Sequence, residues 1–129
     1  MYVLVVDDET DIEPMFRQKF RKEIKTKKID FYFAFSAAES LAYLESPTVR
    51  ENLRLVLSDI NMPDMNGLEM LREIKKKYPQ LAVFILSAYN DEKNKQTAQT
   101  YGANAFLNKP VDFAALKEAI FNLLERSPA

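Results

Sequence analysis

Polar residues of three kinds closely follow short apolar stretches of this sequence. They are Asp7, Asp8, Asp59, Ser87 and Lys109. Three carboxylates that are brought together repel one another when all are ionised, so such a group retains protons or binds a cation. The chain has no histidine and no cysteine, and an all-oxygen ligand set suits a hard ion, Mg²⁺ best. We therefore interpret the three aspartates as a candidate magnesium site.

A lysine and a magnesium ion beside one carboxylate are the parts of a phosphoryl-transfer site. Both cations neutralise charge on the phosphoryl oxygens while the carboxylate, here Asp59, attacks the phosphorus. The hydroxyl of Ser87 can donate a hydrogen bond to a phosphoryl oxygen once the group is attached. Pro63 and Asn66-Gly67 are typical of a turn, which would bend the chain away from Asp59 and leave this carboxylate accessible.

The elements that must position these side chains are short strands that alternate with helices. The strand-like runs are YVLVV (2–6), FYFAF (31–35), LRLVL (53–57), LAVFIL (81–86) and AFL (105–107). This alternation predicts an α/β, doubly wound fold, a parallel sheet with helices on both faces. In such a sheet ligands bind beyond the carboxyl ends of the strands. The polar residues that follow the strands are therefore expected to converge on one pocket.

Apolar spacing and capping residues predict the helices. A four-residue repeat of apolar side chains predicts an amphipathic helix over 11–25. A capping box of Ser36 and Glu39 starts a second helix, a third follows the turn, and Asp112 caps the last. Segment 90–102 has almost no apolar stripe. If it is helical, we expect it to be weakly held and a candidate moving part.

Length and composition bound the class of protein. With 129 residues, 47% of them hydrophobic, the chain is expected to form one domain over 1–129, its final RSPA a fraying end or the start of a linker. Eighteen basic and 19 acidic residues give a net charge of −1, which disfavours direct nucleic-acid binding. Apolar runs are too short to span a membrane, and Met1 stands directly before a strand. We expect a cytoplasmic protein without a signal peptide.

Four stretches together resemble the receiver domain of two-component response regulators, a CheY-like family. They are VVDDE (5–9), SDINMPDMNGLEML (58–71), LSA (86–88) and GANAFLNKP (102–110). Each stretch is weak by itself, but the four in this order and spacing are highly specific, and the resemblance covers essentially the whole chain. It implies a flavodoxin-like (βα)5 fold whose five parallel strands lie in the order 2-1-3-4-5.

The resemblance also implies a role for each residue of the site. Asp59 would be the phosphoacceptor, Asp8 the direct Mg²⁺ ligand, and Asp7 a ligand that acts through water. The main-chain carbonyl of Asn61 would complete the protein ligands. Lys109 would bind the phosphoryl group. The peptide bond between Lys109 and Pro110 would be cis, a form that is common only before proline.

Ser87 would be the switch hydroxyl and Phe106 the aromatic residue that changes rotamer. Many relatives have tyrosine where this chain has Phe106, so no hydroxyl bond can secure an inward rotamer here. Tyr89 lies two residues beyond Ser87, and its bulk could hinder the water that hydrolyses the phosphoaspartate. We therefore predict that Tyr89 affects the phosphoryl lifetime.

The implied function is that of a phosphoacceptor switch. A histidine kinase or histidine phosphotransfer protein would supply the phosphoryl group. The chain would be no enzyme beyond its own phosphorylation and dephosphorylation. Phosphorylation would change the 87–110 face, which would control a partner, a fused output domain or a homodimer. The first helix and its exit carry a basic set, either a solvated face or a docking surface for the phosphodonor: Arg17, Lys19, Arg21, Lys22, Lys25, Lys27 and Lys28.

Three rival functions fit parts of the pattern. A pseudo-receiver would bind a partner without phosphorylation, although unused clustered carboxylates would only cost stability. A haloacid-dehalogenase-type hydrolase places two aspartates two residues apart after its first strand, whereas Asp7 and Asp8 are adjacent. A flavodoxin-like FMN carrier needs glycine, serine and threonine donors at that place, where the DDE of 7–9 would repel phosphate.

Overall fold

The strands form one parallel sheet. The structure is a computed structural model that describes residues 1–62, 64–88 and 91–126. The strands are β1 (Tyr2–Val6), β2 (Asp30–Ala34), β3 (Leu53–Asp59), β4 (Ala82–Ala88) and β5 (Ala105–Lys109). Their order across the sheet is β2-β1-β3-β4-β5, and all neighbouring strands run parallel. The predicted fold class and strand order are confirmed.

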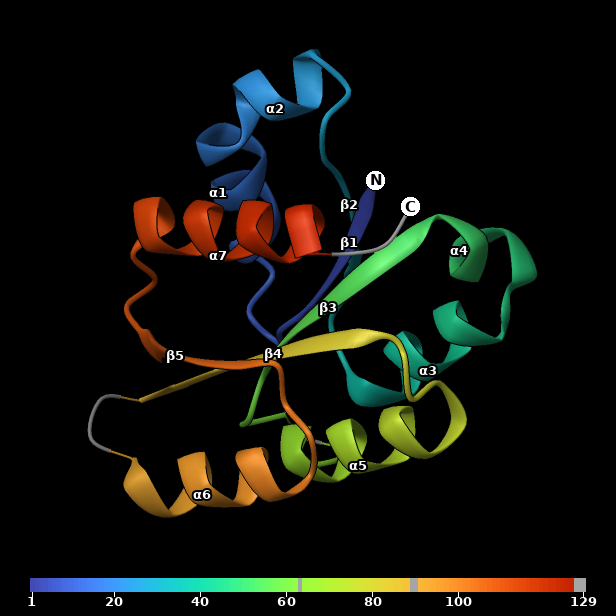
Figure 1. Cartoon of the computed structure of the whole chain (residues 1–129), viewed down its shortest axis with the longest axis vertical. Coiled ribbons are helices and arrows are strands. Elements are labelled where there is room, and N and C mark those ends of the chain that lie inside the picture. The colour runs from blue at the N-terminus through green and yellow to red at the C-terminus, as the bar shows by residue number, and fades with distance from the viewer. Residues whose placement is uncertain (63, 89–90, 127–129) are drawn as a thin grey trace.

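Helices cover both faces of this sheet. They are α1 (Ile12–Lys19), α2 (Arg21–Lys25), α3 (Ala37–Glu45), α4 (Pro47–Asn52), α5 (Gly67–Lys77), α6 (Glu92–Thr100) and α7 (Phe113–Arg126). Figure 1 shows α1, α2 and α7 on one face and α3, α5 and α6 on the other. Among the described residues, no helix combines the length and the apolar character that a membrane span requires.

The alternation of side chains along β1 divides the apolar core into two layers. Val3 and Val5 pack beneath α1 and α7, whereas Leu4 and Val6 pack against the helices of the opposite face. Successive strand side chains point to opposite faces, so a strand buried on both sides must be apolar throughout, and all four residues are at most 1% exposed. The strand lies between β2 and β3 and ends at Val6, so Asp7 and Asp8 directly follow its buried part.

The predicted helix over 11–25 is interrupted at Phe20. Its φ and ψ of −105° and 18° separate α1 from α2, although Phe20 N donates to Phe16 O and Ile24 N donates to Phe20 O, both at 2.9 Å. The Phe20 ring is fully buried and lies 5.0 Å from the Phe31 ring, centroid to centroid. The prediction of one regular helix was therefore wrong. The four-residue apolar repeat is preserved across the kink because the hydrogen bonds continue.

Capping residues begin the helices much as the sequence indicates. Ser36 Oγ accepts from Glu39 N at 3.1 Å, and Asp112 Oδ1 accepts from Ala115 N at 3.2 Å. The short helix α4 was not predicted, although Pro47 is its first residue, a position that proline favours.

Two peripheral segments differ from the central sheet. Helix α6 buries Ala98, in agreement with the sparse apolar content of segment 90–102. Strand β2 lies at one edge of the sheet, and there the Phe31 N–H donates at 2.8 Å to Oδ1 of the neighbouring Asp30.

Candidate functional site

The three aspartates of the predicted metal site lie together at the carboxyl ends of β1 and β3. One carboxylate oxygen from each of Asp7, Asp8 and Asp59 lies within 4.8 Å of the other two. Asp7 is 2% exposed and Asp59 is 6% exposed, whereas Asp8 is exposed to solvent. Two buried carboxylates and one accessible carboxylate thus form an acidic cluster that a cation can reach from solvent.

The backbone around Asp59 holds its carboxylate in one orientation. Ile60 N donates to Asp59 Oδ1 at 2.8 Å, and Gly67 N donates to Ile60 O, also at 2.8 Å. A Cβ added at Gly67 would collide with the carbonyl oxygen of Asp59 and lie 2.9 Å from Ile60 Cα. Asn66 caps α5 by accepting from Leu68 N at 2.7 Å. The chain can fold back this closely behind Asp59 because residue 67 is glycine.

Lys109, the last residue of β5, reaches the cluster with its ammonium group. Its Nζ lies 3.0 Å from Asp59 Oδ2 and 3.3 Å from Asp7 Oδ2. The ammonium therefore links the two buried carboxylates, which come from positions 52 residues apart in the sequence. The peptide bond from Lys109 to Pro110 is cis.

Burial and charge change the pKa values of Asp59 and Lys109. Burial raises the pKa of the Asp59 carboxyl above its ordinary value, and the hydrogen bond and charge of Lys109 offset only part of that rise. Burial lowers the pKa of the Lys109 ammonium, but Asp59 and Asp7 together outweigh burial and leave this pKa above its ordinary value. Lys109 is therefore a permanent cation at neutral pH, whereas Asp59 binds a proton more readily than an exposed aspartate.

A depression in the surface gives access to this cluster. It has a volume of about 570 Å³, and its lining includes Asp8, Asp59, Asn61, Ala88 and Lys109. The structure thus brings Asn61 to the same depression as the acidic cluster. A depression of this size admits a small anionic group and its hydration water.

The predicted switch serine is buried near the end of β4. Ser87 is 3% exposed, and its Oγ donates at 2.9 Å to Oδ2 of Asp91, the residue before α6. The hydroxyl is therefore engaged with the start of α6. Sequence reasoning did not identify Asp91, although an aspartate directly before a helical segment is a recognisable capping signal.

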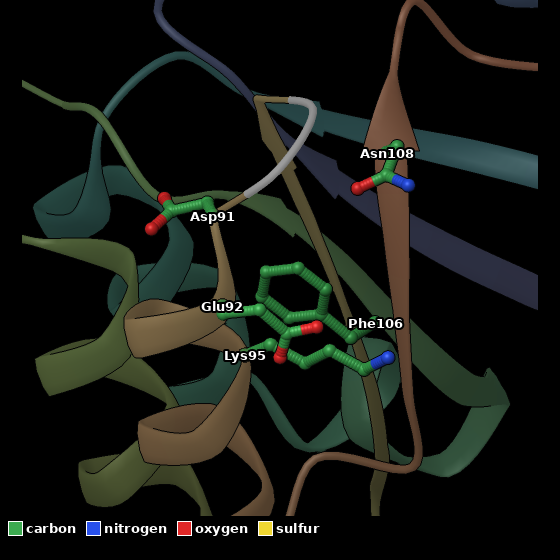
Figure 2. A pocket seen from close by; sticks show the side chains of 5 residues that line it. All are labelled: Asp91, Glu92, Lys95, Phe106 and Asn108. Atoms are coloured by element: carbon green, nitrogen blue, oxygen red, sulfur yellow. The ribbon is translucent and has the colours of Figure 1, made fainter.

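Phe106 projects from β5 toward the first turn of α6. Figure 2 shows its ring beside the side chains of Glu92 and Lys95, with Asp91 and Asn108 at the border of the same pocket. The pocket has a volume of about 100 Å³, and Phe106 is half-buried. The predicted serine and aromatic residues thus meet the same helical turn from two adjacent strands. The predicted role of Tyr89, and the place of Pro63 in the turn, lie outside the described residues.

The donor set agrees with the predicted magnesium ion. Three carboxylates supply hard oxygen ligands, and their oxygens lie close enough to share one ion. One of them is exposed, which suits an ion that retains several waters. The residues present therefore fit Mg²⁺.

Comparison with known proteins identifies the family. Residues 3–121 match the response regulator receiver domain. The chain belongs to this family. Membership places the chain among the receiver domains of two-component response regulators and removes the hydrolase and FMN-carrier alternatives.

Individual relatives match nearly the whole length of this chain. The transcriptional regulatory protein GlrR of Escherichia coli K12 is 34% identical over 98% of this chain, which spans 27% of that protein. Sporulation initiation phosphotransferase F of Bacillus subtilis 168 is 31% identical, with 92% of this chain and 89% of that protein covered. A receiver domain crystal structure from Methanospirillum hungatei JF-1 has a TM-score of 0.82 at 31% identity, covering 96% of this chain and 93% of the other.

Asp64 follows Asp59 in the loop before α5, and its contacts with the start of α3 were not predicted from the sequence. Its carboxylate accepts from Ala37 N at 3.1 Å and from Ala38 N at 2.8 Å, and these hydrogen bonds hold the pKa of Asp64 below its ordinary value. The loop after Asp59 is thereby tied to the start of α3. The sequence places Asp64 in a turn but gives no sign that its partners lie 26 and 27 residues away.

Proposed function

We propose that Asp59 accepts a phosphoryl group from a phosphohistidine of a sensor kinase or a histidine phosphotransfer protein. The observation that carries this proposal is the buried Asp59 carboxylate, held between Ile60 N at 2.8 Å and Lys109 Nζ at 3.0 Å. A bond would form between a carboxylate oxygen and phosphorus, and the bond from phosphorus to the donor nitrogen would break. The small molecule acetyl phosphate would serve as an alternative donor.

Each neighbouring residue would contribute by orientation or charge. The Ile60 N–H fixes the rotation of the Asp59 carboxylate, which aligns it for attack. Lys109 would move its ammonium from the carboxylates to an oxygen of the incoming phosphoryl group. Mg²⁺, held by Asp7, Asp8, Asp59 and the Asn61 main-chain carbonyl, would neutralise charge on the phosphoryl oxygens when bound. The receiver thereby catalyses only its own phosphorylation and dephosphorylation.

Signal output would follow from the new charge at Asp59. A phosphorylated carboxylate has strong acceptor oxygens, and the nearby donors Ser87 and Lys109 would turn toward it. Phe106 would change rotamer beside α6, which reshapes the 87–110 face. That face would contact a target, a fused output domain or a second copy of the chain.

The extent and setting of the domain belong to the same proposal. Residues 1–129 would form one receiver unit, with the last few residues as the start of a linker. The unit would work in the cytoplasm without direct contact to nucleic acid or membrane.

Intact-protein mass after incubation with acetyl phosphate and Mg²⁺ tests the proposal. We expect one added phosphoryl group, lost in Asp59→Asn and in the presence of EDTA. The matched control is Asp11→Asn, an exposed aspartate whose side chain makes no capping bond to α1, and it should be phosphorylated normally. A folded wild type that gains no mass and does not bind beryllofluoride would instead support the pseudo-receiver.

A further inference from the structure

The Ser87 hydroxyl donates to a residue outside the acidic cluster. Its acceptor is Oδ2 of Asp91, at 2.9 Å. A serine hydroxyl has one proton and can donate to one acceptor at a time. Ser87 therefore cannot donate to a phosphoryl group on Asp59 while it donates to Asp91.

Asp91 also makes hydrogen bonds that do not depend on Ser87. Its Oδ1 accepts from Asn94 N at 3.4 Å, and its Oδ2 accepts from Asn94 Nδ2 at 2.6 Å. These bonds cap α6 and hold the carboxylate in place. If Ser87 leaves, the two bonds from Asn94 to Asp91 remain, so α6 need not lose its cap when the receiver switches.

From this geometry we infer that Asp91 is a positioning residue that holds Ser87 in the resting conformation by competing with the phosphoryl group for the single hydroxyl proton. The inference rests on the proposed phosphorylation of Asp59. Activation exchanges one hydrogen bond to an anion for another, and the strength of the Asp91 bond sets how far the phosphorylated receiver shifts toward its active state.

The position of Asp91 connects this competition to the surface. Its side chain borders the pocket in which Phe106 lies beside Glu92 and Lys95 (Figure 2). Release of Ser87 thus removes one contact at the wall of that pocket. Asp91 thus contacts Ser87 and also borders the pocket of Phe106, so the movements of Ser87 and Phe106 would depend on each other.

The resting conformation tests the inference without any phosphoryl group. The Hα–Hβ scalar couplings of Ser87, measured by NMR in the untreated protein, should report one rotamer in the wild type and averaged rotamers in Asp91→Ser. Serine at residue 91 can still cap α6 but lacks the second carboxylate oxygen that Ser87 uses. Averaged couplings in the wild type, or one unchanged rotamer in Asp91→Ser, would overturn the inference.

Binding of beryllofluoride with Mg²⁺ measures the competition itself. Loss of one hydrogen bond to a charged acceptor should tighten binding by Asp91→Ser roughly tenfold. Asn94→Ala removes an Asp91 contact but keeps the bond to Ser87, so it should bind like the wild type. The Asp91 substitution should have no effect when Ser87 is already alanine. A tightening that persists in that background would come from lost charge repulsion and would overturn the inference.

These measurements separate the inference from the function on which it rests. Failure of the wild type to bind beryllofluoride, together with its failure to gain mass, would refute phosphorylation at Asp59 and the competition with it. Normal binding by the wild type with no change in Asp91→Ser would refute the role of Asp91 alone.

Discussion

Replacement of Gly67 by alanine should damage both the stability and the metal site of the receiver. The new Cβ would collide with the carbonyl oxygen of Asp59 and lie 2.9 Å from Ile60 Cα and 3.0 Å from Asp59 C. All three neighbours are backbone atoms, so no side-chain rotation can make room. The backbone behind Asp59 must move, and the carboxylate that it carries must move with it.

The magnitude follows from two opposing effects. Overpacking of this kind costs about 1–3 kcal/mol, whereas alanine gains up to about 1 kcal/mol over glycine in a helix. We expect a net loss of about 1–2 kcal/mol in the free energy of unfolding. For a chain of 129 residues this loss corresponds to a decrease in Tm of about 3–10 °C.

The chain supplies a matched control at Gly102, its second glycine. Gly102 has a φ of +95°, and an added Cβ would lie at ordinary distances of 3.7–3.8 Å from the Lys75 side chain. Gly102→Ala should cost about 1 kcal/mol through backbone strain, at a place remote from the acidic cluster.

Thermal unfolding and Mg²⁺ titration calorimetry distinguish the two variants. Gly67→Ala should lose both Tm and Mg²⁺ affinity, whereas Gly102→Ala should lose Tm alone. A Gly67→Ala protein with wild-type Tm and wild-type Mg²⁺ affinity would refute the close-approach argument. Equal loss of Mg²⁺ affinity in both variants would show that the affinity follows general stability.

Three further substitutions test the electrostatics and the framework. Asp59→Asn should raise the free energy of unfolding in metal-free buffer at neutral pH. Because the pKa of Asp59 is raised in the folded protein, this residue stabilises the fold at low pH, and that stabilisation is lost as the pH rises through the pKa. A gain in the stability of Asp59→Asn that does not depend on pH would contradict this account. Asp64→Ala should lower Tm and weaken Mg²⁺ binding, with the Tm deficit disappearing in acid as the wild-type carboxylate is protonated; an equal deficit at every pH would argue against the cap. Lys75→Met, which removes bonds from Nζ to Leu81 O at 2.8 Å and Asn104 Oδ1 at 2.9 Å, should cost about 1–3 kcal/mol in urea unfolding without changing phosphorylation, and loss of phosphorylation would refute its purely structural role.

Most of the fold can be predicted from the periodicity of apolar side chains in the sequence. The run YVLVV predicts β1 with the bounds observed, because a strand buried on both faces must be apolar throughout. Strands β3 and β4 extend beyond their predicted ends to Asp59 and Ala88. Their last residues are polar or small because they face the site rather than the core, so an apolar criterion ends these strands too early.

The polar contacts of the site could be predicted only in part. Parallel strands bring their carboxyl ends to one edge of the sheet, which is enough to place Asp59 near Lys109. The bond from Ser87 to Asp91 depends on how the chain enters α6, and the bonds of Asp64 depend on how a loop meets α3. Neither bond can be read from the sequence, because Ser87 and Asp91 meet through the local path of the chain and the donors to Asp64 come from residues 26 and 27 positions away.

The hydrogen bond from Phe31 N to the side chain of Asp30 has a consequence for solubility. Edge strands offer unpaired N–H groups that can recruit a strand from another molecule. In β2 one such donor is occupied at 2.8 Å by Oδ1 of Asp30, and the carboxylate adds charge at the same place. An intruding strand would have to displace this bond and desolvate an anion. This part of the edge is thus protected against strand addition, and Asp30→Ala should aggregate faster than the wild type on heating.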